Sequence, residues 1–523
     1  MKKLFFAVLL VSLATACSKS FLERTPINQK VESDFYKTPE DAFEALVSAY
    51  SVLNYDGYGN ILLSSEIASD DCFGGGGTAD NGLRQWDNFQ TYTDHNAAAW
   101  KKYYTGIFRA NVFLKKIDGV NFGSDAALKD QYTGEAKFLR AYFYFDLTRM
   151  FGNVPLLTQP IEGSNFNVSP AIPDSIYALI ASDLKDAVSL LTASAKKFNA
   201  IPAAEYGRVT KWAAEALLAR VYLYYTGYYS KPDLAGLVTK QDATNAIEDV
   251  IQNSGNDLVT NYASLFRASA GASFAGQNNK EGVFVIQYTN KGLGNWDQQN
   301  GNRVQVMVGI RSQVLDPYYK GWGIAPVNGK LWNAFETADT RRSATVISIV
   351  DENLPFNTAT SDQSQYTGYY WKKYTPMGGA DRPDANGGDF QIDNFDNYAV
   401  IRFADVLLMG AELNLSTNLA KAQTYYSRIR DRAFKDVAHR TVLTNDANGL
   451  KLIMTERWLE LALEGHRYWD LLRQGLTVAK QAIDNNTGGE FNVTFRPETK
   501  GLFEIPQTQI GLSNGTLGQN GGW

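Results

Sequence analysis

The stretch GEAKFLRAYFYFDLTRMFGNVPLL occupies residues 134–157 and is the most informative part of the chain for the fold. Its apolar residues recur at three- and four-residue spacing, the pattern of a helix with a broad buried face. Gly152 and Pro155 end that pattern, because both residues are poor helix formers. The stretch therefore predicts a long helix over residues 124–151. The residues of its apolar face are Phe138, Leu139, Tyr142, Phe143, Phe145 and Leu147.

The same periodicity recurs through the first half of the chain. Thr38 followed by Pro39 and two acids is typical of a helix start. Successive helices of similar length favour a mostly α fold, with a tetratricopeptide-like helical scaffold, although no clean 34-residue period is visible. The expected helices cover residues 39–52, 96–117, 124–151, 174–191, 209–229 and 244–253.

A different texture occupies residues 256–398, where Gly, Asn, Asp, Ser and aromatic residues replace the helical pattern. Only short strand-like runs remain, at 283–288 and 344–350. A long irregular segment inside a helical protein is usually functional, so we expect a loop-rich, irregular ligand-binding subdomain here. Helices are expected again at 402–415, 418–433 and 449–474, and the tail, 491–523, has the composition of a polar coil with one ordered element at 502–506.

Composition excludes several classes of protein. The chain has 523 residues and a formal net charge of −5, so it lacks the clustered basic excess of a nucleic-acid-binding protein. Two Cys and three His leave little for zinc chemistry, and no P-loop, H-E-x-x-H or G-x-S-x-G motif occurs. We therefore expect no cofactor and no catalytic residues. Aromatic residues make up 13% of the chain, and several lie in polar, Gly-rich stretches.

The first 17 residues are typical of an export signal. Lys2 and Lys3 precede an apolar run at 4–14, which is too short to span a bilayer. Small residues then lead to Cys17, as in a bacterial lipoprotein box in which the Cys is acylated; the alternative is an ordinary secretory signal with a coincidental Cys. Two or three acyl chains would anchor the protein durably. Cys72, which follows two acids, is interpreted as structural because neighbouring acids raise the pKa of a thiol.

Three further blocks show a resemblance to a known family. Together with residues 134–157, the stretches RFADVLLMGAELN (402–414), ERWLELALEGHRYWDLLRQG (456–475) and GRVTKWAAEALLARVYLY (207–224) resemble the signature blocks of the SusD/RagB family. SFLERTP after Cys17 and the closing FEIPQTQI and LGQNGGW resemble it too, and all occur in the family order.

The resemblance implies a lipid-anchored nutrient-binding protein of the Bacteroidetes outer membrane that faces the extracellular side. It also implies a glycan ligand, a SusC-like TonB-dependent transporter as partner, and no nucleic-acid ligand. Family members often carry acids directly after the lipid Cys, whereas this chain has Ser18, Lys19 and Ser20. The resulting division of the chain is 1–16 signal peptide, 17–36 lipidated tether, 37–255 tetratricopeptide-like half, 256–398 ligand-binding region, and 399–523 C-terminal helices and tail.

Candidate ligand-binding residues are aromatic residues outside the periodic helices, because sugars are bound by flat aromatic faces and a few placed polar groups. Packing in the core is the alternative for each ring. Trp212, Trp458 and Trp469 recur with helical spacing and are assigned to the core. The predicted glycan-binding residues, for stacking or hydrogen bonding, are Trp86, Trp100, Trp296, Trp322, Trp371, Arg84 and Asn295.

The block 456–473 is rich in both acids and bases. Glu456 and Glu460 are one helical turn apart, which is close to the spacing that a glycosidase requires, and His466 lies nearby. The same spacing places acids beside bases, as in Glu464 with Arg467 and Asp470 with Arg473, so we interpret the block as a structural network. Arg140 and Arg402 are expected to be buried partners of such acids.

Two alternatives concern ligands. Four residues in one loop have oxygen ligands suited to calcium, although a solvated turn is the preferred interpretation and no metal site is predicted; they are Asp381, Asp384, Asn386 and Asp389. The favoured function is a non-catalytic surface glycan-binding lipoprotein. A peptide-binding member of the same family and a glycan-active hydrolase are the alternatives.

Overall fold

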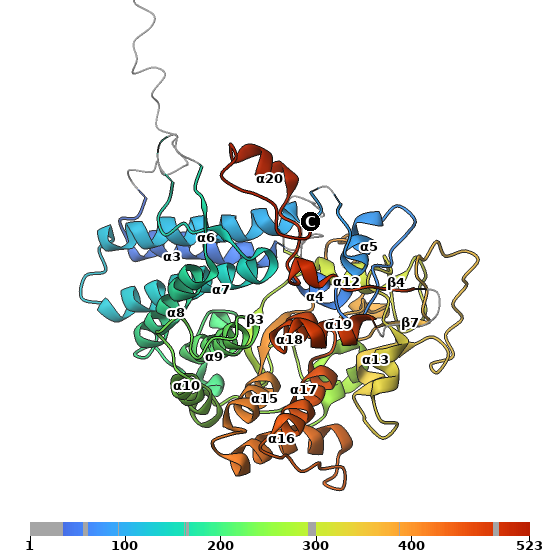
Figure 1. Cartoon of the computed structure of the whole chain (residues 1–523). Coiled ribbons are helices and arrows are strands. Elements are labelled where there is room, and N and C mark those ends of the chain that lie inside the picture. The colour runs from blue at the N-terminus through green and yellow to red at the C-terminus, as the bar shows by residue number, and fades with distance from the viewer. Residues whose placement is uncertain are drawn as a thin grey trace, which may run out of the picture.

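The computed structural model describes residues 35–55, 61–92, 94–161, 163, 167–290, 300–385, 387–484 and 491–523. Helices dominate the described chain, as the sequence predicts (Figure 1). Those of the first half are α3 (Pro39–Tyr50), α4 (Ile61–Ile67), α5 (Asn81–Asn88), α6 (Ala97–Lys116), α7 (Ala126–Phe151), α8 (Pro173–Leu190), α9 (Lys211–Tyr228) and α10 (Lys240–Asn253). Those of the last third are α15 (Phe403–Asn414), α16 (Leu419–Phe434), α17 (Ala447–Leu461), α18 (Arg467–Arg473), α19 (Leu476–Asp484) and α20 (Gln507–Leu512).

The long helices pack on their neighbours in sequence. From α6 to α10 each helix contacts the next, and α10 then contacts α15, which lies against α16. Two of the helices begin at a capping box, which satisfies backbone N–H groups of the first turn. Thr38 and Asp41 form the box at α3, and Thr239 and Asp242 form the one at α10. That second box explains why α10 begins at Lys240, four residues before the predicted start.

The loop-rich region between these two groups of helices is not free of helices. It contains α11 (Arg267–Ala270), α12 (Arg303–Val308), α13 (Gly329–Ala334) and α14 (Arg342–Thr345), all of six residues or fewer, which is too short for periodicity to reveal. Its strands pair in twos, β4 with β5 in parallel and β6 with β7 antiparallel. They are β3 (Gly282–Ile286), β4 (Ile310–Arg311), β5 (Lys320–Gly321), β6 (Val346–Ser348), β7 (Tyr369–Trp371) and β8 (Tyr398–Arg402), while β1 (Val154–Pro155) pairs with β2 (Pro170–Ala171) earlier in the chain.

Strands β3 and β8 join the two ends of the loop-rich region to the helices. They pair antiparallel, and Phe284 on β3 packs its ring 4.9 Å from Phe138 of α7. A separate small core inside the region consists of Ile310, Leu315, Tyr318, Ile347, Ile349 and Tyr370. The domain boundaries given above stay predictions.

The predicted helix at 449–474 is wrong in one respect, because it is broken between α17 and α18. Leu463 and Gly465 have φ angles of +64° and +85°, outside the right-handed helical region. The Gly465 N–H donates to Glu66 Oε1 at 2.8 Å. The break therefore exchanges a helical hydrogen bond for one to α4.

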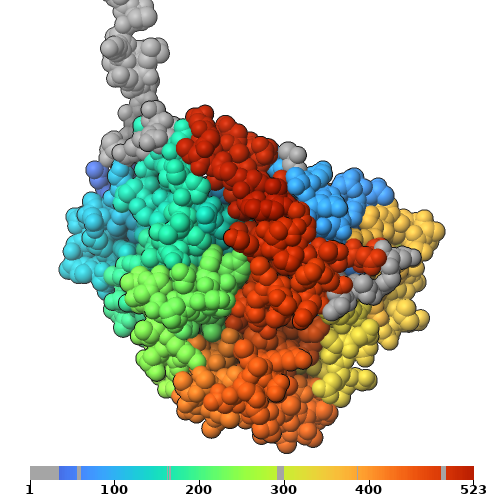
Figure 2. Space-filling model, in the orientation of Figure 1, coloured from blue at the N-terminus to red at the C-terminus, as the bar shows by residue number. Residues whose placement is uncertain are grey.

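The C-terminal tail is more ordered than a polar coil. Figure 2 shows the orange and red C-terminal segment passing between the green and blue N-terminal helices and the yellow loop-rich region. The Phe503 N–H donates to the Met150 carbonyl at 2.7 Å, and the Phe503 ring packs 5.7 Å from that of Tyr468. Within the described residues, no helix combines the length and the apolar character needed to cross a membrane.

Candidate functional site

Three loop segments distant in the sequence meet on one side of the loop-rich region. Residues 72–80, 309–327 and 361–371 form this three-loop face. Phe73 N–H donates to the Pro326 carbonyl at 3.1 Å, and Gly76 N–H to the Gly323 carbonyl at 2.8 Å. Val327 N–H donates to the Tyr369 carbonyl at 3.0 Å. Backbone hydrogen bonds therefore hold all three segments together.

The glycine run after Cys72 makes this close approach possible. Gly75 has a φ of +64°, and a Cβ there would lie 2.1 Å from Pro326 Cδ. A Cβ on Gly77 would lie 2.0 Å from Arg311 Nη2. Only glycine fits a backbone that is packed this tightly.

Arg84, a predicted ligand-binding residue, braces the first loop from α5. Its guanidinium donates to the carbonyls of Gly75 at 3.2 Å, Gly77 at 3.0 Å and Thr78 at 3.2 Å. The side chain is half-buried. Its role toward a ligand stays a prediction, but the structure does place it at the three-loop face.

Trp322, the second predicted residue at this face, is half-buried. Its backbone N–H donates to the Val306 carbonyl at 2.7 Å, and its carbonyl accepts from Arg311 Nη1 at 2.9 Å. Of the predicted residues that the structure describes, Arg84, Trp322 and Trp371 lie at or within these three segments.

The expectation of accessible rings is wrong for Trp371 and Trp86. Trp371 is 0% exposed and its Nε1 donates to the Ala325 carbonyl at 2.8 Å. Trp86 is 4% exposed; its Nε1 donates to Asn96 Oδ1 at 2.9 Å and its ring lies 4.4 Å from that of His95. A buried indole needs an acceptor for its N–H, and both rings find one in the interior. The Trp371 indole therefore joins two of the three loops from within, whereas Trp86 packs against His95 and Phe503, and neither ring faces a ligand.

Trp100 lies elsewhere, on α6 (Figure 1). It is 6% exposed and contributes to a cavity of about 620 Å³ between α6 and α20. Tyr104 and Phe108 line the same side of that cavity, and Gln509 and Leu512 line the other. The structure does not group Trp100 with Arg84 and Trp322. Trp296, Asn295 and Cys17 lie outside the described residues.

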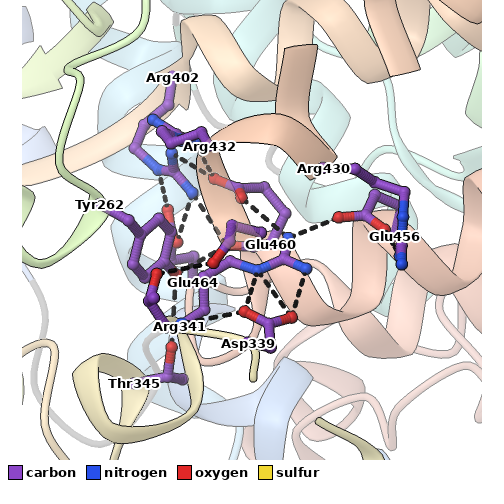
Figure 3. Close-up of polar contacts among 12 residues, drawn as sticks. Tyr262, Asp339, Arg341, Thr345, Arg402, Arg430, Arg432, Glu456, Glu460 and Glu464 are labelled. Carbon is purple, nitrogen blue, oxygen red and sulfur yellow. Dashed lines mark hydrogen bonds and ion pairs between the residues drawn. The ribbon is translucent and has the colours of Figure 1, made fainter. Parts of the chain in front are cut away.

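The acids of the block 456–473 form a buried structural network, as expected (Figure 3). Glu460 is 0% exposed and its carboxylate accepts from Arg341 at 3.1 Å and Arg402 at 3.1 Å. Glu464 accepts from Arg402 and Lys373, each at 2.6 Å. Burial alone would raise the pKa of Glu464, but these two cations outweigh it and hold the pKa at about 2. A carboxylate that is permanently ionised and enclosed by cations cannot serve as a general acid.

One of the two pairings predicted within this block differs in the structure. Asp470 pairs with Arg473 at 2.7 Å, which confirms one of them. Arg467 instead binds Asp70 of the segment after α4, at 2.7 Å, while Glu464 takes the partners described above. Arg140 binds Asp183 of α8 at 2.7 Å, so it belongs to a different ion pair from Arg402.

The suggested calcium loop has other partners. Asp381 pairs with Arg267 at 3.2 Å, and Asp384 accepts from the Tyr319 hydroxyl at 3.0 Å. Asn386 lies outside the described residues, and among those described no group of three or more His, Cys, Asp or Glu could hold a metal ion. Cys72 is fully buried, and burial raises the pKa of its thiol well above the ordinary value.

Sequence reasoning missed Arg311 and Asp362. Arg311 Nε and Nη2 donate to the two Asp362 carboxylate oxygens at 2.7 and 2.6 Å. Asp362 is half-exposed, whereas Arg311 is largely buried. The two residues are 51 positions apart, and no local pattern in the sequence indicates that they pair.

Comparison with known proteins agrees with this architecture. Residues 20–223 match a family model described as starch-binding and associating with the outer membrane, and residues 351–523 match the SusD family model. A SusD-like protein of Bacteroides ovatus is 27% identical over 495 residues, covering 88% of this chain and 80% of the relative.

Two solved structures resemble the chain over nearly its whole length. A laminarin binding SusD-like protein is 31% identical, with a TM-score of 0.77 over 93% of this chain and 100% of the other. Surface glycan-binding protein A from Bacteroides fluxus is 25% identical, with a TM-score of 0.79 over the same shares. These likenesses confirm the mostly α fold with a tetratricopeptide-like scaffold. The chain belongs to the SusD family of surface glycan-binding proteins.

Proposed function

We propose that this protein binds glycan chains at the cell surface without cleaving them and delivers them to a SusC-like TonB-dependent transporter in the outer membrane. The likeness to a laminarin binding SusD-like protein at 31% identity over 93% of the chain is the observation that carries this proposal. Laminarin, a β-glucan, is therefore the first ligand to test.

The proposed site is the three-loop face, with Trp322 as its aromatic platform. Trp322 is half-buried, and its backbone carbonyl accepts from Arg311, so an aromatic ring and a charged group occur together here, as sugar recognition requires. Arg84 and Arg311 fix the surrounding loops, so the platform would be rigid before the ligand arrives, which lowers the entropic cost of binding.

Binding without turnover is the favoured role because the paired acids of the block 456–473 are already used as ion-pair partners. We further propose that Cys17 carries the lipid anchor and that the protein faces the outside of the cell. The apolar run and small residues before Cys17 support this part of the proposal.

The test is calorimetric titration of the protein with laminarin, a starch and a mannan, with analysis of the products. We expect laminarin binding with no released oligosaccharide. Trp322→Ala should weaken laminarin binding roughly thirtyfold, since an aromatic anchor commonly contributes about 2 kcal/mol. Phe108→Ala is the matched control: this exposed ring lines the α6–α20 cavity, so its loss should leave affinity unchanged.

Two results would refute the proposal. Release of sugar from laminarin would show a hydrolase. Binding of peptides in the absence of binding to any of the three glycans would show a peptide receptor.

A further inference from the structure

Asp362 is an exposed carboxylate in an unusually fixed position. Its side chain is 53% exposed, yet both of its oxygens accept hydrogen bonds from Arg311. An exposed acid ordinarily samples many conformations, and a bidentate guanidinium holds it in one. Each carboxylate oxygen has two lone pairs, so Asp362 can still accept hydrogen bonds from the solvent side after it has accepted those from Arg311.

The same guanidinium connects Asp362 to the proposed platform. Arg311 Nη1 donates to the Trp322 carbonyl at 2.9 Å while Nε and Nη2 hold Asp362. Asp362 therefore lies close to the Trp322 backbone although 40 positions separate the two residues in the sequence. Arg311 itself is held in place, because the Gly77 backbone lies against it and Asp80 Oδ2 is 3.8 Å from Nη1.

A neighbouring residue fixes the remaining loop. Gln363 Nε2 donates to the Gly323 carbonyl at 2.9 Å, and its Oε1 accepts from the Tyr370 hydroxyl at 3.2 Å. Gly323 has a φ of +65°, and a Cβ there would lie 1.9 Å from Gln363 Oε1. The segment that carries Asp362 is thus bound to the segment that carries Trp322 at two points, through Arg311 and through Gln363.

From this arrangement we propose that Asp362 is the hydroxyl-binding residue of the glycan site and that Arg311 is its positioning residue; this inference rests on the proposed function. Two hydroxyls on neighbouring carbons of a sugar ring lie close enough together to donate to the two oxygens of one carboxylate. The hydrogen bonds from Arg311 also lower the pKa of Asp362, so the acceptor stays ionised in mildly acidic surroundings.

The test is a double-mutant cycle measured by titration with laminarin. Asp362→Asn keeps the shape and removes the charge, and it should weaken binding about tenfold or more, because hydrogen bonds to charged groups contribute that much. The double variant Asp362→Asn, Trp322→Ala should bind more weakly than Trp322→Ala alone, and any departure from the product of the two single losses measures the coupling through their shared partner, Arg311. A double variant no weaker than Trp322→Ala alone would mean that Asp362 acts only through the platform, which overturns the inference.

Asp431→Asn is the matched control. Asp431 also accepts a two-point contact from an arginine, Arg440, but it lies on α16, at the bottom of Figure 1, whereas β4 and β7 of the loop-rich region lie at the right. It should leave laminarin binding unchanged. Loss of binding in Trp322→Ala with none in Asp362→Asn refutes this inference and leaves the proposed function standing. A wild-type protein that binds none of the three glycans refutes both.

Discussion

Among single residues, Glu66 and Asp71 form the most unusual pair in the interior. Glu66 Oε1 accepts from the Gly465 N–H at 2.8 Å, and Asp71 Oδ1 accepts from Trp458 Nε1 at 2.6 Å. Their other oxygens, Glu66 Oε2 and Asp71 Oδ2, are buried without a donor in the described part of the chain, and the two carboxyls contact each other. Two ionised carboxylates cannot donate, so the pair must hold a proton.

This pair should make stability depend on pH. Burial, with the negative charge of Asp70, raises the pKa of Asp71 to about 7, despite the opposing charges of Arg467 and Lys330. Burial and the neighbouring Asp71 carboxyl raise the pKa of Glu66 well above its ordinary value, with Lys373 opposing. The unfolded chain releases such protons near pH 4. Folding therefore takes up a proton between these values, and the pair's contribution to stability is lost as the pH rises through about 7.

We expect Glu66→Gln to flatten this dependence, because an amide can donate to Asp71 without a bound proton. Between pH 5 and 8, the wild type should lose up to about 1.4 kcal/mol per pH unit relative to the variant. Denaturant unfolding at four pH values measures the difference, with the exposed Glu498→Gln as control. Parallel curves for Glu66→Gln and wild type would contradict the shared proton.

The limits of sequence reasoning also show at single residues. Trp322 and Trp371 both have glycine, lysine or tyrosine neighbours, yet one is half-buried and the other is fully buried. The difference arises from β7, which turns Trp371 toward Ala325, a residue 46 positions away. Local composition cannot indicate such a distant partner.

The longer a helix or strand is, the better the sequence predicts it. Helices α6 to α9 could be predicted because many turns repeat the apolar spacing. Helices α4 and α5, of seven and eight residues, could not. The break between α17 and α18 was missed because Leu461, Ala462 and Leu463 continue the apolar pattern through it. Gly465 was the one local sign of the break.

A side chain at the Gly465 turn should be costly, because it meets both a positive φ and close neighbours. A Cβ there would lie 3.1 Å from the Tyr398 hydroxyl and 3.2 Å from Leu62 Cα, at a φ of +85°. Gly465→Ala should cost more stability than Gly276→Ala, whose φ is +89° but whose Cβ would meet nothing within 4 Å. The control isolates the backbone strain, about 1–3 kcal/mol. Equal losses in thermal unfolding would show that the contacts at Gly465 contribute nothing.

For the whole molecule, the cluster around Glu460 joins segments from two regions. Arg402 is the last residue of β8, Glu281 precedes β3, Glu460 lies on α17 and Glu464 follows it. Arg341, from the loop-rich region, binds the same Glu460. The charges therefore connect the loop-rich region to the C-terminal helices. A buried network of ion pairs such as this one requires every partner, because a buried charge that loses its partner is costly.

Removal of one cation from this cluster should destabilise the whole protein. Arg402→Met leaves Glu281, Glu460 and Glu464 each with one partner fewer, at an expected cost of about 3–5 kcal/mol. Arg440→Ala, which breaks a solvent-exposed pair with Asp431, is the control and should change little. Urea unfolding measures both variants, and similar midpoints would contradict a structural role for the cluster.

The candidate site is a property of the whole molecule as well. Gly75 binds Gln365, 290 positions away, and Arg311 binds Asp362. The sequence indicated the loop-rich region and two residues of the face, but the assembly depends on pairings between distant loops. Those pairings leave no periodic signal in the chain.

A crystal structure of the full chain soaked with a laminarin hexasaccharide tests the account most directly. We expect intact sugar on the three-loop face, with a ring against the Trp322 indole and hydroxyls within hydrogen-bond distance of Asp362. Sugar seated in the α6–α20 cavity beside Trp100, or a cleaved oligosaccharide at any site, would contradict it.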